Sequence, residues 1–209
     1  MQTLEEFLVD TFDPSKWGKH RKSLTSANTG LNLINEINAL NPNLVIDAGC
    51  GHNVFKGHIQ NLIGFDIVEY PFVDIVSPIE NINFRKESAD VVLALGSIQF
   101  GDKQKILDNT SKILSWVKPG GYVVMRVMKE QFHFGVYGEE LLNYRYFWSE
   151  EDIVEITKLH NIEIFKEPVI EDDLDRKGNL RGRRLVWWWK KPGKLKYYSI
   201  DPKTSEIKE

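Results

Sequence analysis

The stretch that decides the fold is residues 44–53, which read LVIDAGCGHN. A short apolar run ends in the carboxylate Asp47, and two glycines, Gly49 and Gly51, follow it. In a parallel sheet, ligands bind beyond the carboxyl ends of the strands, and a glycine-rich bend lets the backbone approach them closely. We therefore expect a buried strand whose end forms part of a ligand site.

Apolar runs and helical stripes alternate on both sides of this stretch. Alternation of this kind predicts an α/β fold with a mostly parallel sheet and right-handed crossovers. The periodicities predict helices over residues 3–12, 31–40, 54–62, 102–116 and 149–160. The expected strands are residues 44–47, 63–67, 72–76, 91–95, 122–127, 162–165 and 185–189.

Composition limits the function classes. The chain has 209 residues, 42% of them hydrophobic, and a net charge of −3, which suits one globular domain without a general attraction for nucleic acid. No apolar run approaches the roughly 18 residues of a membrane span, so no membrane association is expected. The single cysteine, Cys50, excludes an intramolecular disulfide, and we expect a cytoplasmic location. Basic residues are enriched after Arg176, which leaves nucleic-acid binding open for the C-terminal part.

Three ligand classes use a glycine-rich bend after a strand. The phosphate loop needs a Gly-Lys-Ser or Gly-Lys-Thr end, which the chain lacks. The dinucleotide fingerprint needs a third glycine, where Val54 stands. The pattern Asp47-x-Gly49-x-Gly51 resembles motif I of the class I S-adenosylmethionine-dependent methyltransferases.

Four downstream segments resemble the same family in the same order. They are Gly64-Phe65-Asp66 and the segments 88–93, 118–124 and 146–153, and the last is similar to the type-11-like branch. The resemblance spans residues 42–190. It implies a seven-stranded Rossmann-like sheet with helices on both faces and an antiparallel last strand. The expected division is N-terminal helices or a lid over residues 1–41, a core over 42–193 and a tail over 194–209.

The resemblance also implies the site residues. Motif I would surround the methionine part of S-adenosylmethionine, the acid of the second strand would bind the ribose diol, and the fourth strand would face the transferred methyl group. The cofactor residues are then Asp47, Ala48, Gly49, Cys50, Gly51, Asn53, Asp66, Ile67, Pro78, Ile79, Leu95 and Gly96. On the acceptor side, we expect Gln99, Phe100 and Tyr137 to contact the substrate.

His133 is the candidate general base, because the ordinary pKa of histidine lies near neutrality. No histidine or cysteine spacing predicts a metal site. Two features depart from the family pattern. Asn53 stands in place of the third motif I glycine, although asparagine tolerates a left-handed φ. The interval from Asp47 to Asp66 is about one helical turn shorter than in the family.

The sequence thus predicts S-adenosylmethionine-dependent methyl transfer to a small molecule. Three alternatives stay open: a methyltransferase acting on nucleic acid or protein, a cofactor-binding module without turnover, and a nicotinamide-dependent oxidoreductase. The residues do not indicate an oligomeric state or name the acceptor.

Overall fold

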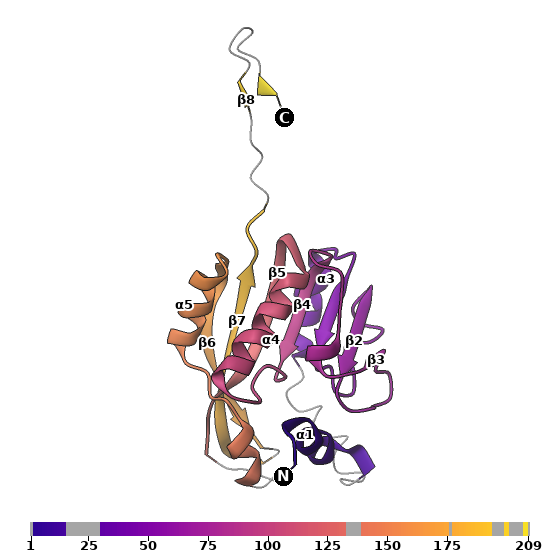
Figure 1. Ribbon diagram of the computed structural model, residues 1–209, viewed down its shortest axis with the longest axis vertical. Coiled ribbons are helices and arrows are strands. Elements are labelled where there is room, and N and C mark those ends of the chain that lie inside the picture. The colour runs from indigo at the N-terminus through magenta and orange to yellow at the C-terminus, as the bar shows by residue number, and fades with distance from the viewer. Residues whose placement is uncertain are drawn as a thin grey trace.

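The computed structural model of the chain describes residues 2–15, 30–132, 139–175, 177–193, 199–200 and 207–208. Figure 1 shows one sheet flanked by helices, with the first helix beneath the sheet's lower edge.

The sheet has seven strands in the order β3-β2-β1-β4-β5-β7-β6. Strands β1 to β5 pair in parallel, whereas β7 runs antiparallel to both β5 and β6. The predicted Rossmann-like topology with an antiparallel last strand is therefore confirmed. The strands are β1 Val45–Ala48, β2 Leu62–Asp66, β3 Ile75–Val76, β4 Ala89–Leu95, β5 Val117–Gln131, β6 Glu163–Leu174 and β7 Leu180–Lys190.

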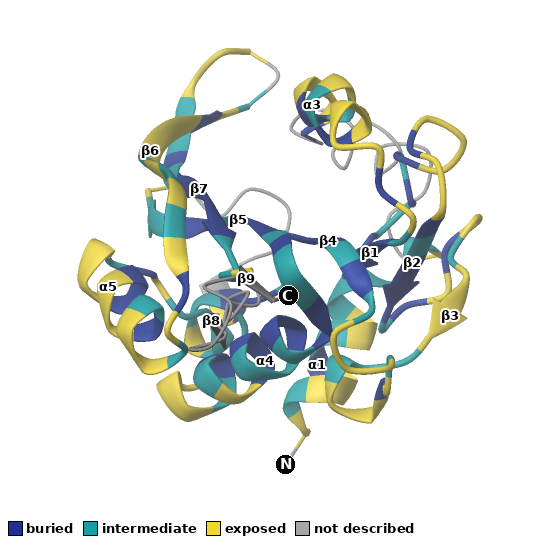
Figure 2. Cartoon of the chain, turned by 90° about the horizontal axis from the view of Figure 1, so that it is seen from above, coloured by how far each residue is buried: buried dark blue, intermediate teal, exposed yellow. Residues whose placement is uncertain are grey.

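Helices cover both faces of the sheet, as Figure 2 shows. On one face α3 (Ile34–Ala39), preceded by η1 (Leu31–Leu33), packs against Val91 and Leu93 of β4. On the other face α4 (Lys103–Trp116) and α5 (Glu150–Leu159) enclose a second core that includes Val92 and Ala94 of β4. Because successive strand residues point to opposite faces, β4 contributes to both cores and is buried almost throughout.

Side-chain caps set where the main helices begin. The hydroxyl of Ser149 accepts a hydrogen bond from the Asp152 amide, and the Asp152 carboxylate accepts one from the Ser149 amide in return. Asp102 caps α4 in a similar way by accepting from the Lys105 amide. These boundaries agree with the sequence prediction, since polar caps satisfy the amides that a helix start leaves unpaired.

The helix predicted over residues 54–62 is wrong. The segment forms successive turns instead, because Asn53, Gly57 and Asn61 adopt φ values of 49°, 81° and 57°. A left-handed residue every four positions interrupts the helical hydrogen-bond ladder. Phe55 and Ile59, which suggested the helix, are still buried in the core beneath α3.

The remaining elements lie around the ends of the sheet. The first helix, α1 (Leu4–Phe12), lies at the carboxyl edge of the parallel strands (Figure 1). The short 3-10 helix η2 (Ile79–Asn81) follows β3, and η4 (Glu139–Tyr144) follows β5. Near the C-terminus, β8 (Ser199–Ile200) pairs antiparallel with β9 (Ile207–Lys208).

Candidate functional site

The bend after β1 is fixed against the neighbouring strands. The amides of Gly49 and Cys50 both donate to the Phe65 carbonyl of β2, each at 2.9 Å. Gly49 has a φ of 76°, and a Cβ at this position would collide with the side chain of Ser97. The Ser97 hydroxyl donates to the Ala48 carbonyl. Glycine is therefore required at position 49 both by the backbone conformation and by the close approach of the loop after β4.

Asp66 joins the ends of β1 and β2. One carboxylate oxygen accepts from the Gly51 amide at 2.8 Å, and the other accepts from the Val68 amide at 2.9 Å. Burial raises the pKa of Asp66, although hydrogen bonds from Val68, Gly51 and Ile67 oppose the shift. The carboxylate thus holds the glycine bend open while keeping further lone pairs available.

Asp47 is the most buried acid of this region, with 3% of its surface exposed. Burial raises its pKa to about 7, the nearby charge of Asp66 adds to the shift, and Arg126 opposes it. No hydrogen bond to the Asp47 carboxylate is present among the described residues. An anion in this setting is poorly compensated, and a cationic ligand would stabilise it.

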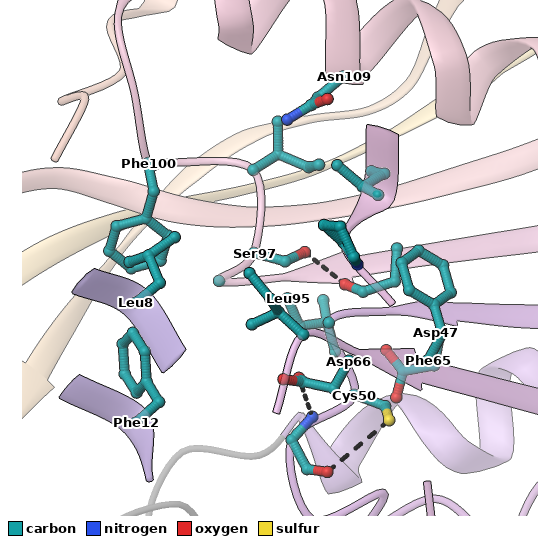
Figure 3. Close-up of a pocket in the computed structure, with 18 of the residues that line it drawn as sticks. Leu8, Phe12, Asp47, Cys50, Phe65, Asp66, Leu95, Ser97, Phe100 and Asn109 are labelled. Carbon is teal, nitrogen blue, oxygen red and sulfur yellow. Dashed lines mark hydrogen bonds between the residues drawn. The ribbon is translucent and has the colours of Figure 1, made fainter. Parts of the chain in front are cut away.

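The two carboxylates open into one cavity of about 450 Å³. In Figure 3, Asp47 and Asp66 lie on one side of this cavity, and Leu8 and Phe12 of α1 lie across from them. Gly51 has a φ of 54° and nothing within 4 Å of where a Cβ would stand, so the bend leaves room beside the acids. The volume is in the range of small-molecule and cofactor pockets.

Most of the predicted site residues meet in this cavity. Eleven of the twelve expected cofactor residues line it: Asp47, Ala48, Gly49, Cys50, Gly51, Asp66, Ile67, Pro78, Ile79, Leu95 and Gly96. The twelfth, Asn53, does not; its amide donates to the Phe72 carbonyl at 2.7 Å, and its side chain packs against Gly64. Its φ of 49° is the left-handed value that asparagine tolerates.

The expected acceptor residues are divided. Phe100 lines the main cavity as well as a smaller neighbouring cavity of about 180 Å³, whereas Gln99 lines only the smaller one. The Gln99 side chain accepts from the Met128 amide at 2.8 Å and so ties the loop after β4 to β5. His133 and Tyr137 lie outside the described residues.

The thiol of Cys50 fits a packing role. The side chain is 9% exposed, and burial, together with the charges of Asp47 and Asp66, raises the pKa of the thiol. A thiol with a raised pKa is a poor nucleophile. Cys50 is therefore a small buried side chain rather than a reactive one.

The sequence predicted N-terminal helices or a lid over residues 1–41, but none of the α1 residues was among the expected site residues. Leu4, Leu8 and Phe12 line the main cavity, and the Tyr70 hydroxyl donates to the Phe12 carbonyl at 2.5 Å. The Phe12 ring packs edge-on against Phe100 with the ring centroids 5.8 Å apart. The apolar stripe of this helix predicted burial, but nothing in its spacing indicated which surface it covers.

The described part of the chain contains no group of three or more histidine, cysteine or acidic side chains that could hold a metal ion. Within the same residues, no helix has the length and apolar character needed to cross a membrane.

Comparisons with known proteins give one short sequence match and many structural ones. No family model matches the chain. A phosphoethanolamine N-methyltransferase of Arabidopsis thaliana is 33% identical over 71 residues, which is 34% of this chain but only 13% of that protein.

The structural likenesses extend over most of the chain. A 1,6-didemethyltoxoflavin N1-methyltransferase of Burkholderia thailandensis aligns with a TM-score of 0.65, 16% identity and 92% coverage of each chain. The N-methyltransferase NodS of Bradyrhizobium japonicum aligns with a TM-score of 0.59 and 11% identity over 88% of this chain and 98% of its own. A phosphoethanolamine N-methyltransferase of Haemonchus contortus has a TM-score of 0.62 and 14% identity over 92% of this chain and 61% of its own. All three were solved with S-adenosylhomocysteine bound.

The chain therefore has the fold of the class I, Rossmann-like, S-adenosylmethionine-dependent methyltransferases. This confirms at the level of fold the resemblance drawn from residues 42–190. At 11–16% identity, the likeness extends to the fold and not to the acceptor.

Proposed function

We propose that the chain is an S-adenosylmethionine-dependent methyltransferase acting on a small molecule. One observation carries the proposal: the buried carboxylates of Asp47 and Asp66 open into the same cavity on either side of the Gly51 bend. A concave site with a few convergent polar groups and a perturbed pKa is typical of a cofactor or active site.

The residues fit the chemical groups of the cofactor one by one. A vicinal diol needs an acceptor with free lone pairs, which the Asp66 carboxylate retains after accepting from Gly51 and Val68. The methionine part carries positive charge, which suits the buried anion Asp47. The open space beside Gly51 would admit the bound cofactor. Pro78 and Ile79 of the η2 segment would supply apolar contact for adenine.

The chain's own contribution would be positioning and exclusion of water. When bound, the cofactor supplies an electrophilic methyl group, so the protein must mainly align an acceptor with it. Leu8 and Phe12 of α1 cover the cavity and would limit both water and acceptor size. This cover supports a small acceptor. His133 as base and Tyr137 as substrate contact stay predictions from sequence.

The proposal also keeps the expected organisation and location. Residues 1–41 would serve as N-terminal helices over the site, 42–193 as the core and 194–209 as a tail, within one cytoplasmic domain. Limited proteolysis with and without S-adenosylhomocysteine would test the division, and cell fractionation would test the location.

Thermal-shift measurements with S-adenosylmethionine, S-adenosylhomocysteine and NAD would test the function. At about 100 times its dissociation constant, a ligand adds about 2.7 kcal/mol of stability. We expect both adenosyl ligands to raise Tm and NAD to leave it unchanged. Asp66→Asn should weaken the response to S-adenosylhomocysteine by about tenfold or more in Kd, because the diol loses a charged acceptor.

Asp74→Asn is the matched control, because Asp74 lies beside β2 but outside the cavity and pairs with Lys56. It should bind S-adenosylhomocysteine like the parent protein. Stabilisation by NAD in place of S-adenosylhomocysteine would favour an oxidoreductase and refute the proposal. Cofactor binding with no methyl transfer to any of a broad acceptor panel would favour a binding module.

A further inference from the structure

The smaller cavity beyond β4 and β5 is lined by an unusual concentration of cations. Four arginines, Arg126, Arg145, Arg181 and Arg184, line it, against a single acid, Asp173. The arginines come from β5, β7 and the segment after η4, so the sheet topology gathers them from distant parts of the sequence.

The fold places Arg126 and Arg184 on the same face of the sheet, at the end next to the large cavity. On the α3 face of β5, the apolar Tyr122 and Val124 are followed two residues on by Arg126, which pairs in register with Leu95 at the end of β4. On β7 the same face passes from Trp188 and Val186 to Arg184. The apolar face thus becomes cationic where the cofactor cavity begins.

A single carboxylate oxygen serves two of the four arginines. Oδ1 of Asp173 accepts from Nη2 of Arg184 at 2.7 Å and from Nη2 of Arg181 at 3.0 Å. Asp173 is 4% exposed, and the side chains of Arg184 and Arg181 are 17% and 21% exposed. The buried Nε of Arg181 makes no hydrogen bond within the described part of the chain.

Burial is the main cause of the lowered pKa values of two of these arginines. It lowers the pKa of Arg126 to about 10; the charge of Arg184 adds to the shift, and Glu171, Asp173 and Asp47 oppose it. Burial also lowers the pKa of Arg184, against the pull of Asp173. Burying like charges together is costly unless a further anion compensates them.

The small cavity adjoins the proposed cofactor cavity. Leu95, Gly96, Arg126 and Arg184 line both of them, whereas Pro78 and Ile79 lie only in the larger one. An occupant of the small cavity would therefore lie on the β4 side of the cofactor, the side that the sequence resemblance assigns to the transferred methyl group. That is the place of the methyl acceptor.

We propose that the methyl acceptor carries an anionic group, a carboxylate or a phosphate, which the small cavity binds through Arg184 and Arg126. This inference rests on the proposed function, since it takes the large cavity for the cofactor. Arginine presents donors in a planar fork that matches the oxygens of both anions. The remaining, neutral part of the acceptor extends toward the methyl group past Gly96 and Phe100.

Calorimetric titration of the full chain, saturated with S-adenosylhomocysteine, tests the proposal. The probes are acetate, methyl phosphate and the uncharged acetamide, at constant chloride concentration. We expect at least one anion to bind and acetamide not to bind, and the stronger of the two anions identifies the acceptor's group. Arg184→Gln should weaken anion binding by about tenfold or more, and should change S-adenosylhomocysteine binding much less, although Arg184 also lines the larger cavity.

Arg183→Gln is the matched control on the same strand, because Arg183 lines neither cavity and pairs with Glu130 and Asp172. It should keep the anion affinity of the parent protein. Asp173→Asn should tighten anion binding, and its Tm should rise more with the anion than that of the parent protein, so the test survives if Arg184→Gln fails to fold.

Equal binding of acetate and acetamide, or an anion affinity unchanged in both Arg184→Gln and Asp173→Asn, would overturn the proposal. Failure of S-adenosylhomocysteine to bind the parent protein would instead refute the proposed function, so the two failures are distinguishable.

Discussion

At the scale of single residues, the buried carboxylate of Asp47 should lower the stability of the ligand-free protein and favour the binding of a cationic cofactor. Its pKa is raised to about 7 by burial and by Asp66, from an ordinary value of 3.8. A carboxyl group whose folded pKa exceeds its unfolded pKa binds its proton more tightly in the native state. Stability is therefore lost as the pH rises from about 4 to about 7, and the full cost is present above that range.

Asp47→Asn should accordingly stabilise the ligand-free protein at about pH 8 and change little at about pH 4. Each pKa unit corresponds to about 1.4 kcal/mol, and we expect a gain of roughly 1–3 kcal/mol in the free energy of unfolding, measured by urea denaturation. The same variant should lose affinity for S-adenosylmethionine. In the parent protein, that affinity should fall as the pH drops below about 7, because the cationic ligand favours the ionised carboxylate.

Asp74→Asn provides a control of opposite sign. Burial alone would raise the pKa of Asp74, but hydrogen bonds from Lys56 and Gly64 outweigh it and lower the pKa. Stability from Asp74 is thus present above its unfolded pKa and is lost as the pH falls, so Asp74→Asn should destabilise the protein at about pH 8. A loss of stability in Asp47→Asn at the same pH would contradict the raised pKa of the buried Asp47 carboxyl group.

Motif I was predictable at the residue scale because its chemistry is local. The spacing of Asp47, Gly49 and Gly51 is itself the bend, and the structure places all three around one cavity. The role of Asn53 is less local. The left-handed backbone of Asn53 was predictable from its residue type. Its side chain, however, packs against Gly64 and donates to the Phe72 carbonyl, and neither residue is a sequence neighbour.

At the scale of elements, the sequence allowed α1 to be part of a lid but did not show which surface it covers. Its apolar residues predicted a buried face, but the surface it covers is created by the ends of β1, β2 and β4. The Tyr70 hydroxyl bonds to the last carbonyl of this helix, and the Tyr70 ring also packs against His52 at a centroid distance of 4.5 Å. The contact links the helix over the cavity to the loop after β2.

Tyr70→Phe tests this link with minimal change in packing. Removing one hydrogen bond should cost about 1 kcal/mol or less of global stability. The larger effect should fall on the site: looser docking of α1 should raise the S-adenosylhomocysteine dissociation rate by several-fold, measured by stopped-flow competition. Phe72, which is 73% exposed, gives a control position, and Phe72→Leu should leave the rate unchanged. An unaltered rate in Tyr70→Phe would mean that the hydrogen bond does not hold α1 over the cavity.

The sheet itself was predictable because its central strands are continuous apolar runs bounded by turns. Residues 91–95 of β4 are an example, since their side chains contribute to both hydrophobic cores. The failed helix over residues 54–62 shows why elements near the site are harder to predict. There, Phe55 and Ile59 have helical spacing, yet asparagine and glycine at four-residue intervals favour turns, which still bury both side chains on the α3 face of the sheet. The apolar pattern thus predicted correctly that Phe55 and Ile59 are buried, but it predicted the wrong backbone conformation.

At the scale of the whole molecule, the basic residues that cluster near the C-terminus in sequence are divided among separate contacts in the structure. Its cations are engaged within the fold: Arg183 pairs with Glu130 and Asp172, and Lys191 pairs with Glu87. Lys190 lies over the rings of Tyr122 and Phe165. Arg181 and Arg184 share Asp173 beside the small cavity. The enrichment in sequence thus does not translate into a continuous basic surface over the described part of β7.

The molecule as a whole should therefore bind nucleic acid weakly. Its net charge is −3, and a protein that neutralises many phosphates shows a steep fall in affinity with salt. We expect fluorescence anisotropy with labelled single- and double-stranded oligonucleotides to give Kd values no tighter than about 100 µM at physiological salt, the weak end of non-specific binding. Raising the salt from about 50 mM to about 200 mM should change the signal little. A Kd below about 1 µM with a steep salt slope would instead favour a nucleic-acid substrate, and weakening of that binding by Arg183→Gln would place the contact on β7.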